Sequence, residues 1–396
     1  MGVVDAGRSK FARDAAAKGD YASAVIALKN AVQEKPAAAE IRVLLADALE
    51  RRHELADAEQ QLQRAIEAGG DEAALVPRLA LMMLDRGDLD GLVRIFKDKR
   101  LSDPNADASL RGTLALAQIA LARIPAARAL IENMPAVPTV KLARAQLLVA
   151  AGKQTEALES LALEHAETPW WMLRAGKRLA TAAGYPDRGM QYLTRAYQAA
   201  PWNLGLAGEY GEALYSAGRF DEAAVVRDAL RKSAPRFFWS LYLDALLLSR
   251  AGRVDEAHAA ALNALKTSPE SLPASLLAAS AELEKGDLMM ANRRLQGLVR
   301  SHPDSVPAIR LFAQSQARLG LAGEATATVE RGLKLADDTS LFLLKGELEM
   351  AAGRATAAEA AFNRVVAARP RDPEMRMPLV QLRLQQGDAR GAGELL

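Results

Sequence analysis

The chain has 396 residues, of which 50% are hydrophobic and 25% charged, and its 51 Lys and Arg nearly balance 49 Asp and Glu. This balance gives no reason to expect nucleic-acid binding, because phosphate backbones attract clustered positive charge. The chain has no cysteine, which excludes disulfides, thiolate chemistry and zinc sites with cysteine ligands. Aromatic residues make up only 5% and Ala and Leu dominate, so we expect an all-helical fold.

Membrane spans are not expected from the hydropathy pattern. No apolar stretch approaches the roughly 18 uninterrupted residues of a membrane-spanning helix. The longest Ala- and Leu-rich segment, residues 113–131, is broken by four residues: Gln118, Arg123, Pro125 and Arg128. The opening MGVVDAGRSK matches neither a signal peptide nor a myristoylation signal, because its sixth residue is Ala6.

Turn markers recur along the chain at a nearly fixed interval of 34 residues. Ten are glycines and two are other residues: Gly19, His53, Gly87, Leu121, Gly152, Gly184, Gly218, Gly252, Gly286, Gly320, Gly353 and Gly387. The interval is 31 residues after Leu121 and 32 after Gly152, and it then returns to 34 apart from a single interval of 33 before Gly353. A fixed period of this size is typical of a solenoid, in which each repeat contacts only its neighbours.

The segment Phe238–Pro269 shows how one interval is built. Apolar residues stand at helical spacing on both sides of Gly252: Leu241, Ala245 and Leu248 before it, then Ala257, Ala261 and Ala264 after it. Gly252 can end the first helix in a left-handed conformation, and Pro269 stops the second. Each repeat is therefore predicted to be a pair of amphipathic helices that stacking must stabilise.

The other intervals repeat this pattern: a small residue in the first helix, Gly followed by a polar and an apolar residue, Ala three further on, and a closing Pro. The pattern resembles the tetratricopeptide repeat over almost the whole chain. The resemblance implies an all-α, right-handed superhelical α-solenoid of about twelve helix-turn-helix repeats in a single array over residues 1–396. The repeats would begin near residues 5, 39, 73, 107, 138, 170, 204, 238, 272, 306, 339 and 373.

The fourth and fifth repeats depart most from the pattern. Leu121 replaces the turn glycine, and prolines at positions 135 and 138 come early. These changes favour either a tightened turn between helices or a change in the pitch of the superhelix. The last repeat stops at Leu396, partway through its second helix, so we expect the chain to be a fragment of a longer protein.

The opening run FARDAAAKGDYASAVIALKNAVQEKP and the paired-helix segment after it carry a closer resemblance. They resemble the N-terminal part of the repeat lipoproteins found with exosortase and PEP-CTERM sorting systems in exopolysaccharide loci of Gram-negative bacteria. In that family a lipid-modified cysteine precedes the first repeat. The resemblance implies a periplasm-facing protein, held at the outer or inner membrane only by that N-terminal anchor, with a role in polysaccharide production or export.

Catalytic and metal-binding patterns are not found in the sequence. The four histidines, at positions 53, 165, 258 and 302, never pair at helical spacing, and no phosphate-binding or nucleophile motif occurs. We interpret His53 as a solvated turn residue. Acidic pairs such as Asp255-Glu256 fall at helix starts, where they complement the helix dipole. We therefore expect no enzyme, no cofactor and no metal site.

Aromatic residues cluster in one stretch, which contains 13 of the 19 between positions 170 and 242. By register, Tyr210 and Phe220 are expected inside. Six residues are expected on first helices facing the concave groove: Trp171, Arg174, Arg178, Tyr215, Trp239 and Tyr242. Exposed aromatics beside arginine suit peptide anchors or the apolar faces of sugar rings. The alternative is that these rings only pack between helices.

Tetratricopeptide co-chaperones that bind a C-terminal carboxylate use Asn and Lys on first helices. The seven asparagines here, Asn105 among them, lie in second helices or loops by this register, which argues against such a clamp. Three functions stay open: a periplasmic scaffold with protein partners in an envelope or polysaccharide assembly, a cytosolic peptide-binding adaptor, and the periplasmic half of an outer-membrane polysaccharide export porin. Polysaccharide itself is a further candidate ligand for the groove.

Overall fold

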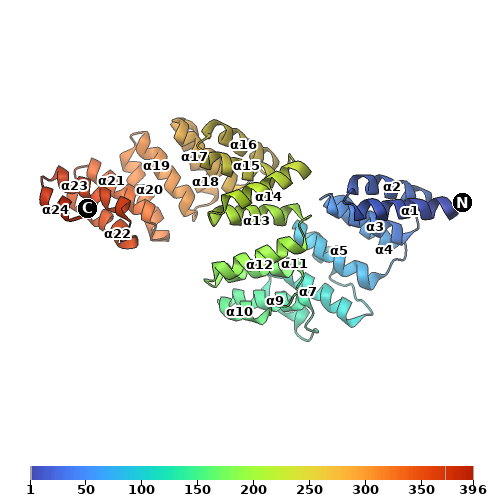
Figure 1. Cartoon of the computed structure of the whole chain (residues 1–396). Coiled ribbons are helices and arrows are strands. Elements are labelled where there is room, and N and C mark those ends of the chain that lie inside the picture. The colour runs from blue at the N-terminus through green and yellow to red at the C-terminus, as the bar shows by residue number, and fades with distance from the viewer. Residues whose placement is uncertain (1, 371, 396) are drawn as a thin grey trace. The chain divides into compact units, whose positions relative to one another are not determined.

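The structure is a computed structural model that describes residues 2–370 and 372–395, with side chains from residue 10 onward. The described residues form 24 helices and no strand (Figure 1). The helices are joined by short turns in twelve consecutive pairs. This confirms the expected all-helical array of helix-turn-helix repeats.

By packing, the chain divides into two compact units, Met1–Ala213 (unit 1) and Leu214–Leu396 (unit 2), with the boundary inside α13. Unit 1 contains α1 (Gly2–Ala17), α2 (Tyr21–Glu34), α3 (Ala39–Arg51), α4 (Leu55–Glu67), α5 (Glu72–Arg86), α6 (Leu89–Phe96), α7 (Pro104–Ala120), α8 (Ile124–Ile131), α9 (Pro138–Ala150), α10 (Gln154–Ser160), α11 (Trp170–Ala182) and α12 (Pro186–Ala199). The boundary helix is α13 (Leu204–Ser216). Unit 2 continues with α14 (Phe220–Ser233), α15 (Phe238–Arg250), α16 (Val254–Thr267), α17 (Leu272–Lys285), α18 (Leu288–Ser301), α19 (Val306–Arg318), α20 (Ala322–Leu335), α21 (Thr339–Ala351), α22 (Ala355–Ala368), α23 (Pro373–Gln385) and α24 (Ala389–Leu395).

Left-handed residues separate the two helices of each pair. All ten marker glycines have positive φ, between 69° and 85°, and His53 takes the same conformation at 61°. The marker predicted at Leu121 is wrong by one residue, because Leu121 has φ −82° and Ala122 has φ 58°. The Leu121 amide still donates to the Ala117 carbonyl, so the first helix of this repeat lasts one residue longer than the period predicts.

The start of α7 also differs from the register, which placed it near residue 107. Asp103 caps the helix by accepting from the Ala106 amide at 2.7 Å, and Pro104 occupies the first helical position, which proline favours. Asn105 therefore lies in a first helix, not in a loop or second helix as predicted.

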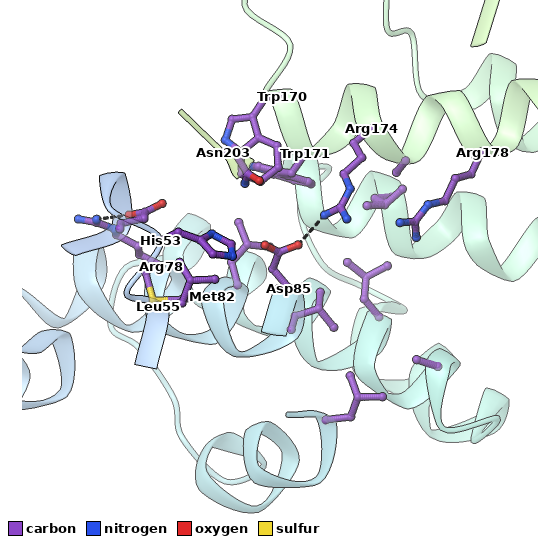
Figure 2. Close-up of a pocket in the computed structure, with 18 of the residues that line it drawn as sticks. His53, Leu55, Arg78, Met82, Asp85, Trp170, Trp171, Arg174, Arg178 and Asn203 are labelled. Atoms are coloured by element: carbon purple, nitrogen blue, oxygen red, sulfur yellow. Dashed lines mark hydrogen bonds and ion pairs between the residues drawn. The ribbon is translucent and has the colours of Figure 1, made fainter. Parts of the chain in front are cut away.

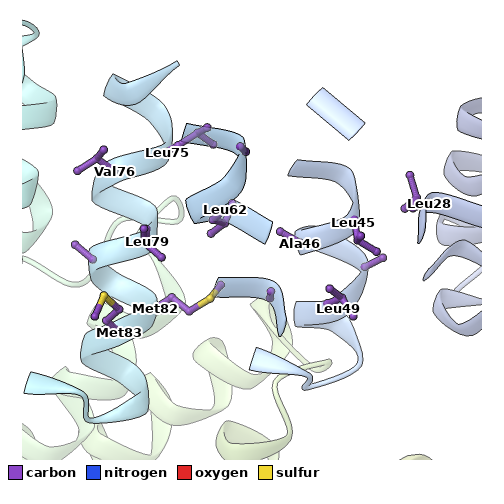
Figure 3. Close-up of a cluster of buried hydrophobic side chains, with 14 of the residues drawn as sticks. Leu28, Leu45, Ala46, Leu49, Leu62, Leu75, Val76, Leu79, Met82 and Met83 are labelled. Carbon is purple, nitrogen blue, oxygen red and sulfur yellow. The ribbon is translucent and has the colours of Figure 1, made fainter. Parts of the chain in front are cut away.

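The core of each repeat is built from small and branched apolar residues. In unit 1 one buried cluster extends from α1 to α7 and includes Leu28, Leu45, Leu62, Leu79 and Met83 (Figure 3). The neighbouring repeats thus share one continuous interior, as stacking of amphipathic pairs requires. Clusters in unit 2 are smaller, such as the one formed by residues of α19, α20 and α21.

Second helices are short in the third, fourth and fifth repeats. α6, α8 and α10 have 8, 8 and 7 residues, whereas α2, α4 and α12 have 14, 13 and 14. Across these three repeats the chain curves enough for Asp85 of α5 to contact Arg174 of α11 at 2.7 Å. The two interpretations of the irregular repeats, a tightened turn and a change in pitch, both stay predictions.

Candidate binding site on the first-helix face of unit 1

A cavity of about 490 Å³ lies between α5 and α11 in unit 1, on the face formed by the first helices of the repeats (Figure 2). Its floor is apolar and is contributed by successive first helices: Leu81 and Leu84 of α5, Leu116 of α7 and Leu142 of α9. Binding sites in proteins span about 300–1,000 Å³ and are mostly apolar with a few polar groups. The cavity has the size and the lining of such a site.

Three tryptophans form part of the rim. Trp170 and Trp171 stand in the first turn of α11, and Trp202 comes from the turn between α12 and α13. Trp170 and Trp202 meet edge to face, with ring centroids 6.2 Å apart and an interplanar angle of 79°. The guanidinium of Arg51, at the end of α3, lies 4.4 Å from the Trp202 ring centroid.

The position of α11 depends on the segment before it. After the short helix α10 the chain turns through Ala162 at φ 47°, and Leu163 is buried against α11. A Cβ at Gly176 would lie 2.1 Å from a Leu163 methyl carbon, so a larger residue there would require the Leu163 side chain to shift. The tight packing fixes the helix that carries Trp170 and Trp171.

Arg174 joins the two sides of the cavity. It donates to Asp85 of α5 at 2.7 Å, and its Nε donates to both Glu209 oxygens of α13 at 3.0 and 3.1 Å. Burial acts to raise the pKa of Glu209, but the hydrogen bonds and positive charge of Arg174 outweigh it and hold that pKa below its usual value. We call this set of contacts among Asp85, Arg174 and Glu209 the clasp.

The other two arginines of the rim differ in how far they are already paired. Arg78 contacts Asp47 at 2.6 Å and Glu50 at 2.7 Å. Arg178 keeps 65% of its side chain exposed, and its ion pair with Glu209 is long at 3.4 Å. Because Arg174 already holds Glu209, Arg178 is the guanidinium best placed to meet a negative group of a bound partner.

His53 lies in the turn between α3 and α4 as predicted, but it lines the cavity and is half-buried, so it is less solvated than expected. Burial lowers the pKa of His53, and the negative charge of Asp85 opposes this effect only in part. His53 is therefore neutral at pH 7 and presents an aromatic ring with a polar edge. Its position follows from the curvature of unit 1, which faces the α3–α4 turn toward α11.

The six predicted groove residues separate into two groups. Trp171, Arg174 and Arg178 line the cavity of unit 1. Tyr215 and Trp239 are half-buried in unit 2, where Tyr215 packs edge-on against Phe220 at 5.2 Å.

Tyr242 is not a groove residue, contrary to prediction. Its side chain is only 5% exposed, stacks on Phe238 at 5.5 Å and belongs to a core cluster with Ala264 and Ala274. The small alanines of α16 and α17 leave room for the ring between the helices. Trp239 also meets this ring edge-on, at 5.9 Å.

The two aromatics expected inside are both covered. Tyr210 is 8% exposed and stacks on Tyr197 at 4.7 Å. Phe220 is half-buried, and the Arg250 guanidinium lies over its ring at 3.7 Å. Trp170, Trp202 and Asp85 were missed as cavity residues, because the first two were read only as members of an aromatic-rich stretch.

Among the described residues, no group of three or more His, Asp or Glu has the arrangement of a metal site. None of the helices that the structure describes is long and apolar enough to cross a membrane. The polar groups of the cavity can donate and accept hydrogen bonds, and its rings and leucines can bury apolar surface. This is the chemistry of a binding site.

Comparison with known families agrees with the repeat pattern. Two family models, each described as tetratricopeptide repeat, match residues 15–79 and 180–245 and residues 242–289 and 343–396. Together they match more than half of the chain, which belongs to the tetratricopeptide repeat family. This fold is typically a non-catalytic scaffold for protein–protein interaction.

The solved structure of the APC/C hetero-tetramer Cut9–Hcn1 contains a chain with the same fold. That chain is 12% identical with a TM-score of 0.54, and the match covers 99% of this chain and 86% of that chain. A tetratricopeptide repeat protein from Parabacteroides merdae ATCC 43184 is 17% identical with a TM-score of 0.47, covering 62% of this chain and 97% of that one. The search of curated proteins found no match to this sequence.

Proposed function

We propose that this protein is a non-enzymatic interaction scaffold that captures a segment of a partner protein in the cavity of unit 1. The observation that carries the proposal is the cavity itself, with its leucine floor and its rim of three tryptophans and three arginines. Trp and Arg are the residues most enriched among the energetic anchors of protein interfaces. A floor built from three successive first helices also gives the partner a surface that spans several repeats.

We further propose a setting in the cell envelope, where the scaffold supports exopolysaccharide biosynthesis or export, or the associated protein-sorting system. The support for this is the resemblance of the opening run FARDAAAKGDYASAVIALKNAVQEKP to exosortase-associated repeat lipoproteins. The complete reading frame tests it. A lipid-modified cysteine ahead of the first repeat supports the envelope scaffold, the absence of any export signal supports a cytosolic adaptor, and alternating ten-residue strands support an export porin.

A polysaccharide is the second candidate ligand of the cavity. Its support is the presence of half-buried tryptophan rings beside arginine, Asp85 and Asn203, because sugar rings pack their apolar faces on aromatic rings while polar groups bind the hydroxyls. Protein capture is favoured because leucines from three successive first helices line the cavity, and these suit apolar side chains better than hydroxyl-bearing rings.

The test uses the whole chain with two probes, a displayed library of random linear peptides and an array of acidic and neutral oligosaccharides. We expect enrichment of peptides, and loss of their binding by about 2 kcal/mol or more in Trp171→Ala, as for a buried aromatic anchor. Tyr185→Ala is the matched control, because Tyr185 is 46% exposed in the same unit and does not line the cavity.

Three results separate the candidates. If peptide binding is unchanged in Trp171→Ala, the cavity is not the capture site. Oligosaccharide binding without peptide enrichment would replace the protein partner by a glycan. An equal loss in Trp171→Ala and Tyr185→Ala would show a general effect on folding, which circular dichroism at the helical bands detects.

A further inference from the structure

Trp202 makes a contact that the stacking of repeats in a solenoid does not require. It lies in the turn before α13, yet its ring meets Arg51 of α3, several repeats away in the array. In a solenoid each repeat contacts only its neighbours, so stacking alone does not account for this pair. Trp202 also lines two cavities of unit 1, the one of about 490 Å³ described above and a second of about 460 Å³.

The second cavity lies on the same face and shares Glu50, Arg78 and Trp202 with the first. Its other lining residues come from the first repeats and include Tyr21, Leu28, Leu44 and Arg51. The two cavities therefore adjoin, and the indole of Trp202 is part of the boundary between them. A ligand side chain that touched both cavities would have to lie where the Trp202 indole now lies. We call the two cavities together the groove.

We infer that Trp202 is a built-in occupant of this groove, and that the partner segment presents an aromatic side chain that replaces it beneath Arg51. This inference rests on the proposed capture of a partner in unit 1 and names the chemistry of that partner. The Arg51 guanidinium is 4.4 Å from the Trp202 ring centroid, and the Trp170 ring meets the Trp202 ring edge to face with centroids 6.2 Å apart. We call this position of the Trp202 ring, between Arg51 and Trp170, the seat.

The geometry selects an aromatic ring over a sugar ring. A guanidinium stacked on a ring is attracted by the negative face of a π system, which a saturated sugar ring lacks. The Trp170–Trp202 pair likewise depends on the opposite charges of ring edge and ring face. An aromatic residue of a peptide reproduces both contacts, whereas a pyranose reproduces neither.

Replacement of Trp202 leaves the rest of unit 1 in place. The clasp joins Asp85, Arg174 and Glu209 and does not involve the indole. The next residue, Asn203, caps α13 by accepting from the Leu206 amide at 3.0 Å, so the start of α13 is held by a separate contact. The indole can thus leave the seat without loss of the helices on either side.

The direction in which one mutation changes peptide affinity tests this inference. The probe is the tightest peptide selected from a displayed library on the wild-type chain, made synthetically with a fluorescent label. In Trp202→Ala the seat is vacant and no displacement is needed, so we expect the peptide to bind about two- to fivefold more tightly. When Arg51→Ala is added to Trp202→Ala, the cation is lost for the peptide ring alone, and we expect binding about two- to fivefold weaker than in Trp202→Ala.

Arg52→Ala is the matched control for Arg51→Ala. Arg52 is the next residue, pairs with Glu54 at 2.7 Å and lines neither cavity, so its loss should leave peptide affinity unchanged. A second control replaces the aromatic residue of the peptide by cyclohexylalanine, which keeps the size and removes the π face. This peptide should lose the dependence on Arg51.

The outcomes separate this inference from the proposed function. Unchanged or weaker binding by Trp202→Ala overturns the inference, and if Trp171→Ala still abolishes binding, the cavity remains the capture site. Selected peptides without a shared aromatic residue also overturn it. If no peptide is enriched on either the wild type or Trp202→Ala, both the inference and the proposed protein capture fail.

Discussion

Units 1 and 2 are built from the same repeat pattern but differ in how far their contacts reach along the chain. In unit 1, Arg174 contacts Asp85 and Arg51 contacts Trp202, and each pair joins repeats that are not neighbours. The ion pairs described in unit 2 lie within one helix or join adjacent helices, as in Arg227 with Asp244 at 2.8 Å. The side-chain contacts of unit 1 therefore close a curved segment, while those of unit 2 follow the local stacking of repeats.

Short second helices distinguish the middle of unit 1 from repeats seven to eleven of unit 2. The second helices α14, α16, α18, α20 and α22 of unit 2 all have 14 residues, whereas α6, α8 and α10 of unit 1 have 8, 8 and 7. The cavity lies where the short second helices occur. A candidate binding site can thus arise where a repeat array is irregular, here where its second helices are short, and not only on its regular face.

Loss of the clasp should produce the largest effect. Arg174→Met keeps the bulk of the side chain but leaves Glu209, only 17% exposed, without its main partner, at a cost of about 1–3 kcal/mol. Hydrogen exchange should then increase in both α5 and α11. The control is Arg227→Met, which removes a pair of similar burial in unit 2 and should increase exchange only in α14 and α15. If hydrogen exchange increased only in adjacent helices in both variants, the proposed difference between units 1 and 2 would be contradicted.

Lowering the pH should weaken the Arg174–Glu209 contact reversibly, and the loss of stability should be smaller than in Arg174→Met. The pKa of Glu209 is lowered in the folded protein, so the folded state binds fewer protons than the unfolded state around pH 4.5, the usual value. The stabilisation is present above that pH and is lost as the pH falls through the lower folded value. Chemical unfolding between pH 7 and pH 3 should show this loss, and Glu209→Gln should reduce it. An unchanged pH dependence in Glu209→Gln would contradict the assignment.

The smallest effect should come from the shifted turn in unit 1. Ala122 holds a left-handed conformation at φ 58°, so Ala122→Gly should stabilise the protein by about 1 kcal/mol. Leu121 has φ −82°, so Leu121→Gly should destabilise it by a similar amount, since glycine there gains nothing and loses the side chain. Thermal unfolding measures both. A stabilising Leu121→Gly would restore the regular 34-residue marker.

The sequence predicted the repeats well because their determinants are local. A glycine such as Gly252 ends a helix wherever a left-handed residue is needed, and the apolar spacing around it defines both helices. The same register placed Trp171, Arg174 and Arg178 on a first helix, where they line the cavity. These features depend on residues within one repeat.

The remaining features depend on contacts between distant repeats. Asp85, His53 and Trp202 meet the cavity only because unit 1 curves, and no pattern within a repeat encodes the amount of curvature. Tyr242 was assigned to the groove from its register alone, but its orientation depends on the size of the residues opposite it, Ala264 and Ala274. Side-chain packing across helices decides such cases.

The clasp also has a consequence for how the array can change in length. Adding or removing a 34-residue repeat in unit 2 would leave neighbouring interfaces of the same kind. The same change between α5 and α11 would carry Asp85 out of reach of Arg174 and divide the cavity lining. The copy number of this segment is thereby constrained, and unit 1 would tolerate duplication or deletion of a repeat far less than unit 2.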